Sequence, residues 1–447
     1  MVIGVAALLL SSCGLYQKYE SKADVPADVY GTNVSNTANS AAEMSWRDFF
    51  TDPQLQALID SAIINNTDLH ASRIAVEKSQ IALKTAKLAY LPSLYFNPSG
   101  SLSSFDNSPV SKSYNLPLQI DWQPDIFAGL TNQKRKAEVL LEQTKYMEEA
   151  MRANIISTVA QLYSRLQIYD RQLYILLTTE KLWAESLETQ KVLMENGKAY
   201  STAVNQMEAS YLNVKTQIVD IKNEIHHTEL SLCRLLAISP RHISRGEWGS
   251  YQLPQNIGVG VPSQMLSLRS DVKVAERAMA AAYYNVNDAR SAFFPSISLS
   301  GAAGWTNNAG IVSDPGKLLW NVVASLSQPI FARGKLRANL KINELTQEEV
   351  AKKYVQTIIN AGNEVNEAIA DCNASLEKDQ LYKRQVSVLK DAFDGTHELM
   401  NNGKANYLEV LTAQEALLQA QLAEAMNLYN GSISTIALYI ALGGATK

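Results

Sequence analysis

Cysteine, excess charge of one sign and long apolar runs are all scarce in this chain of 447 residues. Its three cysteines have neither the CxxC spacing nor the nearby histidines of a metal site, and Cys233 and Cys372 fit helical patterns as small buried apolar residues. The formal net charge is −4, with basic residues spread along the chain, so nothing favours nucleic-acid binding. No apolar stretch is long enough for a membrane-spanning helix.

The motifs of enzymes are missing as well. No glycine-rich phosphate loop or nucleophile motif occurs, and His226-His227 lies in a helical stretch without a suitable carboxylate partner. We interpret the two histidines as part of a solvated helix face. The sequence therefore predicts no enzyme: no catalytic residue, no metal site and no cofactor, apart from the covalent lipid considered below.

What the chain does contain is an internal duplication. Three short motifs recur in the same order at an offset of about two hundred residues: Ala86–Ser93 with Ala289–Ser296, Pro124–Gly129 with Pro329–Gly334, and Met194–Ala199 with Met400–Ala405. This offset is far longer than the period of a solenoid or propeller repeat. The chain is therefore expected to contain two copies of one large structural repeat.

The N-terminus predicts export. Val2–Leu10 is an apolar run of signal-peptide length, and the small residues just before Cys13 look like the lipobox of a bacterial lipoprotein. We therefore expect residues 1–12 to be a signal peptide and Cys13 to carry a covalent lipid. Residues 13–45 would then form the lipid anchor and an extended linker. Gly14 follows the cysteine instead of the aspartate that resembles an inner-membrane retention signal, which favours the outer membrane.

Each repeat is expected to contain a helix, a β-hairpin, a long helix and a shorter helix. The first helices are predicted from about Leu55 to Tyr90 and from about Ser263 to Phe293. The remaining boundaries in the first repeat (46–238) are hairpin 93–124, long helix 131–196 and helix 202–238. In the second repeat (263–447) they are hairpin 296–328, long helix 336–402 and helix 405–442, after a connector at 239–262.

The hairpins alternate between apolar and polar residues over about the ten residues that a tilted membrane strand needs. The residues predicted to face lipid are Leu116, Leu118, Ile120, Trp122, Trp320 and Val322. A soluble sandwich would show similar alternation, but four strands cannot close a barrel, whose smallest bacterial form has about eight. Because an open edge is not tolerated in lipid, several chains must share one barrel, and three would supply twelve strands.

The helix lengths predict a tube. Each long helix would extend roughly 100 Å, and the two shorter helices of each copy together contain about as many residues as the long one. Two short helices can therefore stack end to end beside each long helix. Segments Trp46–Asn66 and Pro240–Gln264 would form a small mixed belt at the level where they meet. The predicted fold is an internally duplicated α+β membrane protein with a trimeric β-barrel continued by an α-helical barrel.

In this organisation the chain resembles the TolC-like outer-membrane efflux proteins, and within them the lipoprotein branch serving resistance-nodulation-division pumps. The motifs that carry the resemblance are short and ordered: Trp46, Phe49, Phe50, Asp52, Leu55, Leu58, Ile59, then Asn66, Asp68, Leu69, Ala71, then Leu268–Val272 with Ala275-Glu276, and Tyr407–Leu411 with Gln414. Ser270 replaces the proline of the family's Arg-Pro-Asp-Val element. The resemblance implies a homotrimer in the outer membrane of a Gram-negative bacterium, with its barrel in lipid and its helical tunnel in the periplasm. It also implies a periplasmic adaptor and an inner-membrane pump as partners.

The resemblance further implies two sites at the periplasmic end. The turns that would contact the adaptor are Asn196-Gly197-Lys198 and Asn402-Gly403-Lys404, although plain turn chemistry also explains Asn-Gly. Some family members carry paired acidic residues that ring a closed entrance, and Asp391 and Asp394 are the candidates here. They could equally be solvated residues outside the channel.

Other functions stay open. A channel for type I protein secretion would share this architecture, and a lipid-anchored coiled-coil spacer or adhesin would explain the helices but not the strands. The ten methionines are scattered, so metal transport has no positive support from the sequence.

Overall fold

The computed structural model describes residues 16–20, 44–106, 108–246, 268–307 and 317–445. The chain divides into two compact units, each assembled from segments of both sequence repeats. The first unit lies within Met1–Val25, Ile74–Tyr146 and Lys273–Gln356, and the second within Pro26–Arg73, Met147–Val272 and Thr357–Lys447. Cys13 and most of the predicted linker lie outside the described residues.

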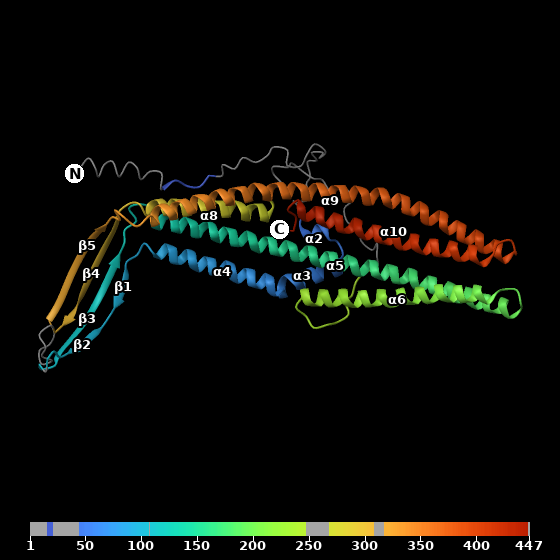
Figure 1. The fold of residues 1–447 in the computed structure, drawn as a ribbon, viewed down its shortest axis with the longest axis horizontal. Coiled ribbons are helices and arrows are strands. Elements are labelled where there is room, and N and C mark those ends of the chain that lie inside the picture. The colour runs from blue at the N-terminus through green and yellow to red at the C-terminus, as the bar shows by residue number, and fades with distance from the viewer. Residues whose placement is uncertain (1–15, 21–43, 107, 247–267, 308–316, 446–447) are drawn as a thin grey trace. The chain divides into compact units, whose positions relative to one another are not determined.

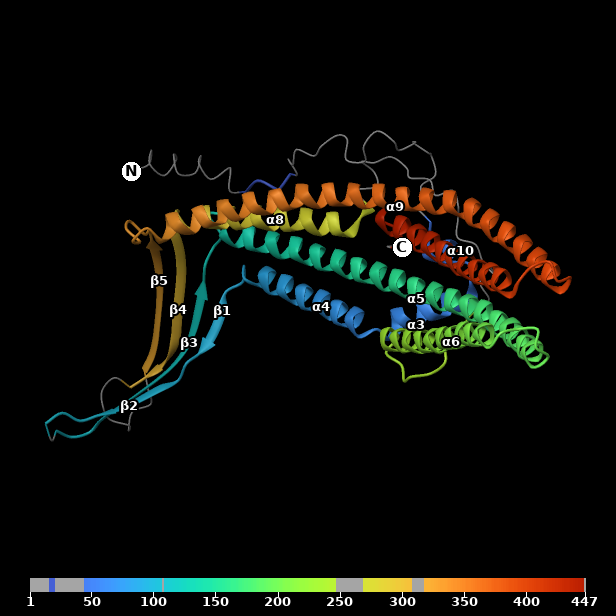
Figure 2. The same ribbon diagram turned by 45° about the vertical axis from the view of Figure 1, so that its right-hand side comes forward.

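The first unit contains one antiparallel sheet with the strand order β1-β3-β4-β5 (Figures 1 and 2). Its strands are β1 (Ser93–Phe96), β2 (Ser99–Ser103), β3 (Ser111–Trp122), β4 (Ser296–Thr306) and β5 (Lys317–Ser327), and β2 also pairs with β3. The pairing of β3 with β4 joins the two repeats into one sheet.

The first predicted hairpin therefore has three strand segments instead of two. Phe96 pairs with Leu118 and Ser99 pairs with Asn115, so β1 and β2 keep the same register along β3. Pro98 lies in the gap between them, Pro117 lies opposite the neighbouring Asn97, and neither proline has an N–H for the ladder. β1 and β2 are consequently two segments of one strand interrupted by proline. The described sheet therefore has four strand lines, meaning four positions side by side, with β1 and β2 sharing one of them.

Four helices contribute residues to both units: α4 (Thr67–Leu88), α5 (Gly129–Glu195), α8 (Ser270–Ser291) and α9 (Lys335–Asn401). In the first unit, Val139 of α5 packs against Ala280, Ala281 and Tyr284 of α8. The N-terminal residues 16–20 join this cluster, because the Tyr19 N–H donates to the Tyr284 hydroxyl at 3.2 Å.

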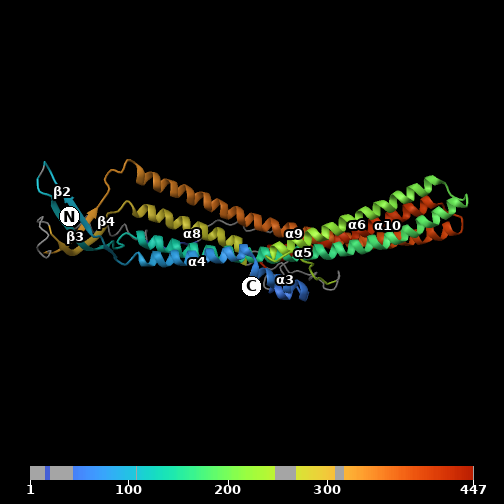
Figure 3. The same ribbon diagram turned by 90° about the horizontal axis from the view of Figure 1, so that it is seen from below.

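The second unit holds α2 (Trp46–Phe49), α3 (Pro53–Asn65), α6 (Ser201–Leu235) and α10 (Tyr407–Ala441) together with parts of the four shared helices. Trp183 of α5, Val214 of α6 and Leu411 of α10 belong to one apolar core, and Figure 3 shows these helices running alongside one another. Phe49 of α2 stacks on Tyr439 of α10 with ring centroids 4.0 Å apart, which attaches the short N-terminal helices to α10.

The long helices α5 and α9 contain 67 residues each and begin and end within two residues of the expected bounds. The prediction of one helix from Leu55 to Tyr90 is wrong, because the structure has two helices there, α3 and α4, separated at Asn66. Residues 263–267, where the corresponding helix of the second repeat was expected to begin, lie outside the described residues. Among the described helices, none has a stretch long and apolar enough to span a membrane.

Candidate functional site

The sheet has one continuous apolar face. Residues that pair directly across strands share a face, and the registers place Leu118, Ala303 and Trp320 in one row and Ile120, Gly301 and Val322 in the next. The six side chains predicted to face lipid belong to this apolar face, and all are exposed in the single chain: Leu116, Leu118, Ile120, Trp122, Trp320 and Val322. Trp320 and Val322 are the most exposed of them, at 71% and 73%.

The opposite face is mainly polar. Gln119 pairs with Ala302, which pairs with Asn321, and the next row contains Asp121 and Ser300. The Gln119 amide donates to the Asp121 carboxylate at 3.0 Å, so polar groups on this face satisfy one another. On β5, Val323 lies in the row of Asp121 and Ser300, and both Val323 and Leu319, which shares this face in the row of Gly304, are about half exposed.

Two glycines allow β3 and β4 to approach closely. A Cβ added to Gly304 would lie 2.7 Å from Pro117 Cα and closer still to the Leu116 carbonyl oxygen. A Cβ on Gly301 would lie 3.0 Å from Ile120 Cγ2. The sequence patterning did not single out either residue, although glycine within a strand pattern commonly marks a close backbone approach.

Aromatic residues connect the strand ends to the helices. The Trp122 indole N–H donates to the Tyr90 carbonyl at 3.0 Å, and the Tyr90 hydroxyl shares a 3.0 Å hydrogen bond with Thr131. Phe127 stacks on Phe294 with ring centroids 5.0 Å apart. The Phe127–Phe294 pair thus joins the two repeats near the ends of their strands.

Equivalent joints connect the shorter helices in the two repeats. In the first joint, the Asn66 side-chain N–H donates to the carbonyl of Leu235, the last residue of α6, at 2.9 Å. In the second joint, the Arg269 guanidinium donates to the carbonyl of Ala441, the last residue of α10, at 2.8 Å. Both bonds satisfy a helix-end carbonyl that lacks an intrahelical partner. They lie where each pair of short helices was predicted to meet end to end.

Each joint follows a left-handed helix cap. Ala237 (φ 51°) and Gly443 (φ 92°) occupy the positions at which α6 and α10 turn. The N–H groups of Ile238 and Gly444 each donate back into the preceding helix at 3.0 Å, the pattern of a Schellman motif. The left-handed conformation favours glycine, so Gly443 adopts it without strain, whereas Ala237 carries the steric cost of its Cβ.

The second joint is a buried ionic cluster. The side chain of Arg269 is only 8% exposed and binds both Asp271 carboxylate oxygens at 3.0 and 2.7 Å and Glu364 of α9 at 2.6 Å. Burial alone would raise the pKa of Asp271, but the hydrogen bonds and charge of Arg269 outweigh it and hold that pKa below its usual value. The family resemblance singles out the segment Leu268–Val272, which contains Arg269 and Asp271, but only the structure shows the contacts of Arg269 to α9 and α10.

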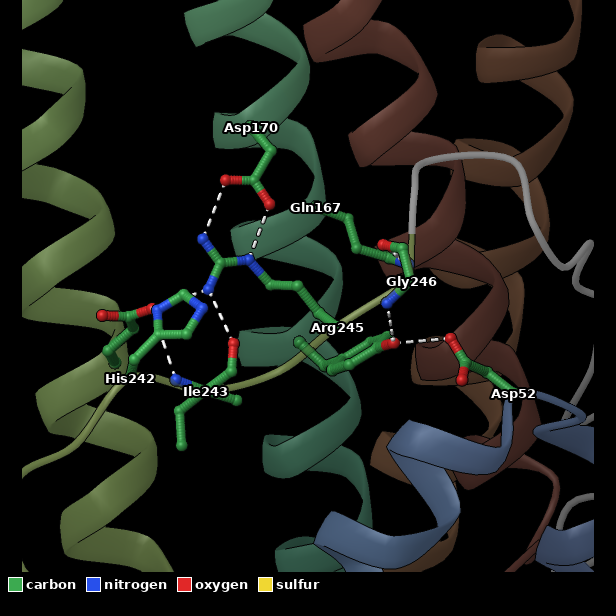
Figure 4. A network of polar contacts seen from close by, with 9 residues as sticks. Asp52, Gln167, Asp170, His242, Ile243, Arg245 and Gly246 are labelled. Atoms are coloured by element: carbon green, nitrogen blue, oxygen red, sulfur yellow. Dashed lines mark hydrogen bonds and ion pairs between the residues drawn. The ribbon is translucent and has the colours of Figure 1, made fainter.

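A second polar network holds the described part of the connector, residues 239–246, against α5 (Figure 4). Arg245, 8% exposed, forms a bidentate contact with Asp170 at 2.6 and 2.8 Å and a 2.6 Å contact with Glu229. The Tyr163 hydroxyl donates to Asp52, which adds the segment before α3. Charge patterning alone did not indicate this network, because its members come from three distant segments.

The two tip turns share one backbone geometry. Gly197 and Gly403 have φ values of 70° and 67°, and the N–H groups of the following lysines donate to Leu193 and Leu399 at 2.8 and 2.9 Å. A Cβ on either glycine would meet nothing within 4 Å, so conformation alone requires glycine here. The six candidate contact residues are all exposed: Asn196, Gly197, Lys198, Asn402, Gly403 and Lys404.

The aperture candidates Asp391 and Asp394 are exposed on α9, in the last turns before the Gly403 tip. Neither side chain forms a hydrogen bond or ion pair within the described part of the chain. His226 and His227 are exposed on α6, as the solvated-face interpretation expects. Cys233 is buried and Cys372 is partly buried, and both are free thiols. Over the same described ranges, no group of three metal-ligating side chains is found.

A duplicated chain with an apolar-faced sheet and paired long and short helices has the architecture of an outer-membrane channel protein. The model of the outer membrane efflux protein family matches residues 58–237 and 261–444, one segment in each repeat, and the chain belongs to that family. It is accordingly an efflux channel protein of the outer membrane.

The relatives match nearly the whole chain. The cation efflux system protein CusC of Escherichia coli O6:H1 strain CFT073 is 28% identical over 449 residues, covering 98% of this chain and 97% of CusC. The probable outer membrane lipoprotein SilC of Salmonella typhimurium is 28% identical over 422 residues, covering 92% and 90%. A crystal structure of CusC matches with a TM-score of 0.86 at 27% identity, covering 96% of this chain and 99% of that one.

Proposed function

We propose that three copies of this chain form one outer-membrane exit duct that passively conducts substrates arriving from a periplasmic adaptor and a resistance-nodulation-division pump. The observation that carries the proposal is the open sheet. Within the described residues, β5 pairs only with β4, and β1 and β2 pair only with β3, so both edges are unpaired while the apolar face is exposed. Four strand lines cannot close a barrel, and lipid does not tolerate open edges. Three copies would close a twelve-stranded barrel.

Conductance and oligomeric state together test this function. Purified protein is expected to run as a heat-sensitive trimer and to form ion-conducting channels in a planar bilayer. A monomer that conducts no ions would instead favour a lipid-anchored structural protein. Type I secretion would be favoured if the chain restored export of a secreted polypeptide but not efflux of a small molecule.

The tip turns are the proposed adaptor contact. Their left-handed glycines place Asn196, Lys198, Asn402 and Lys404 on exposed turns, and neither lysine forms an ion pair within the described residues. Replacing both lysines with glutamate is expected to abolish crosslinking to the adaptor while leaving trimer and conductance intact. Unchanged crosslinking would assign the turns to structure alone.

We assign Asp391 and Asp394 to the periplasmic aperture, where three chains would bring six carboxylates together. Such a ring would attract cations. In a planar bilayer, Asp391→Ala/Asp394→Ala is therefore expected to reduce cation selectivity and block by multivalent cations. Wild-type selectivity and block in that variant would place the pair outside the channel.

Cys13 is the proposed lipid attachment site, and SilC is a relative whose name includes the word lipoprotein. The described residues nearest to it are anchored on the first unit: Arg135 donates to the Tyr16 carbonyl at 2.7 Å, and the Tyr16 hydroxyl donates to the Asp125 carbonyl at 3.0 Å. Metabolic labelling should incorporate palmitate into the wild type and not into Cys13→Ser. Absence of label from the wild type would contradict the assignment.

A further inference from the structure

Basic residues concentrate where the sheet meets the helices. The four connecting segments of the first unit, residues 84–92, 123–136, 288–295 and 328–337, contain nine Lys or Arg and only two acidic residues, Asp125 and Asp288. We call these nine basic residues the basic collar. Its excess of seven positive charges contrasts with the net charge of −4 for the whole chain.

The strands themselves contain very little charge. The five described strands contain only three charged residues, Lys112, Asp121 and Lys317. Lys112 and Lys317 lie at strand ends away from the connecting segments. The boundary between an almost uncharged sheet and the basic collar is therefore sharp.

Helix stability does not explain the basic collar. The helices α5 and α9 both start within it, and neither has an acidic residue in its first turn. Cations near a helix N-terminus oppose the helix dipole, yet Lys335 begins α9 and Lys134 lies in the second turn of α5. Ion pairing explains little of it: Arg290 lies 3.8 Å from Glu344, whereas Lys84, Lys87 and Lys335 have no ion pair within the described residues.

The basic collar adjoins the apolar face directly. Trp122, the last apolar-face residue of β3, donates to the Tyr90 carbonyl, and the Lys134 ammonium lies 5.9 Å from the centre of the Tyr90 ring. The order from the sheet outward is thus apolar side chains, an aromatic contact and then a cation. That order matches the hydrocarbon, interface and headgroup levels of one membrane leaflet.

We propose that the basic collar binds the phosphate groups of anionic glycerophospholipids in the periplasmic leaflet of the outer membrane. The inference rests on the proposed function, because it requires the sheet to span that membrane. Each basic residue near an anionic membrane surface strengthens binding by about fivefold, and three chains would place the basic collar all around the barrel. Its contribution is to select anionic lipid and to fix the depth of the duct.

Native mass spectrometry of the detergent-solubilised full-length trimer tests the proposal. The trimer is mixed with phosphatidylglycerol or with phosphatidylcholine of the same acyl chains, and the lipid adducts that it retains are compared. The wild type is expected to retain phosphatidylglycerol preferentially and to lose the preference in 0.5 M salt, where exposed charges are screened. Lys87→Gln/Lys335→Gln/Arg337→Gln is expected to lower the preference by at least about fivefold.

The matched control is Lys181→Gln/Lys222→Gln/Lys378→Gln, which removes the same charge from exposed positions of the second unit. It is expected to keep the wild-type preference. Equal retention of both lipids by the wild type, or an equal loss in both variants, would overturn the proposal. Planar-bilayer conductance separates this proposal from the proposed function. Wild-type channels that conduct without a lipid preference contradict only lipid binding by the basic collar. A wild type without conductance contradicts the proposed function.

Discussion

Placing an arginine on the apolar face of β3 is the most direct test of how the sheet meets lipid. Leu118 lies four residues from Trp122, the last residue of the strand. At about 3.3 Å per residue and a tilt of about 40°, it lies roughly 10 Å from the interface level, well inside a hydrocarbon layer about 30 Å thick. Leu118→Arg is therefore expected to cost roughly 2–4 kcal/mol of folding free energy for each subunit.

Gln119→Arg is the matched control, because it adds the same side chain one residue away on the polar face. The assay is the fraction of heat-sensitive trimer on unheated gels, together with the urea midpoint of protein refolded into vesicles. Leu118→Arg should lose most of its trimer, whereas Gln119→Arg should stay close to the wild type. Equal losses would show that the apolar face does not contact lipid.

Five further substitutions address the sheet and the joints. Gly304→Val should abolish trimer formation, because its side chain would collide with the β3 backbone, whereas Gly395→Ala, with open space around it, should form trimers normally. By calorimetry, Ala237→Gly should stabilise the protein by about 1 kcal/mol, because glycine relieves the strain of the left-handed backbone. Gly443→Ala should destabilise the protein by more than this, because the added Cβ would also lie 3.2 Å from the backbone of Leu268. The pKa of Asp271 is lowered in the folded protein, so its ionised carboxylate stabilises the fold. This contribution to the free energy of unfolding is complete above the ordinary aspartate pKa of about 3.9 and is lost as the pH falls through the lowered pKa. Acid unfolding in that range should be less steep in Asp271→Asn, and an unchanged pH profile would contradict the ionic joint.

Regular features of the fold could be predicted from the sequence. The long helices could be bounded because glycine and proline are absent or rare between their ends, and the strand faces could be assigned because their side chains alternate. Strand count could be anticipated in the same way. These features depend on neighbours in the sequence, which patterning reads directly.

Long-range contacts could not be predicted. Asn66 fits a helical pattern, but it ends α3 because its side chain caps α4 through the N–H groups of Asp68 and Leu69 and reaches Leu235 of α6. Asn followed by Thr and Asp was an available capping signal. The register between β3 and β4, and the closeness of Gly304 to Pro117, depend on residues almost two hundred positions apart.

The duplication has produced two joints with the same geometry and different chemistry. The first joint depends on the neutral amide of Asn66, so neither protons nor salt change its hydrogen bond directly. The second joint depends on the guanidinium of Arg269 and also holds Glu364 of the long helix α9. In a duct of three such chains, neutral joints would therefore alternate around the wall with ionic joints, and only the ionic joints would change in strength with the pH and salt concentration of the periplasm. Its helical wall would respond to the environment with threefold symmetry, although its backbone is built from six similar repeats.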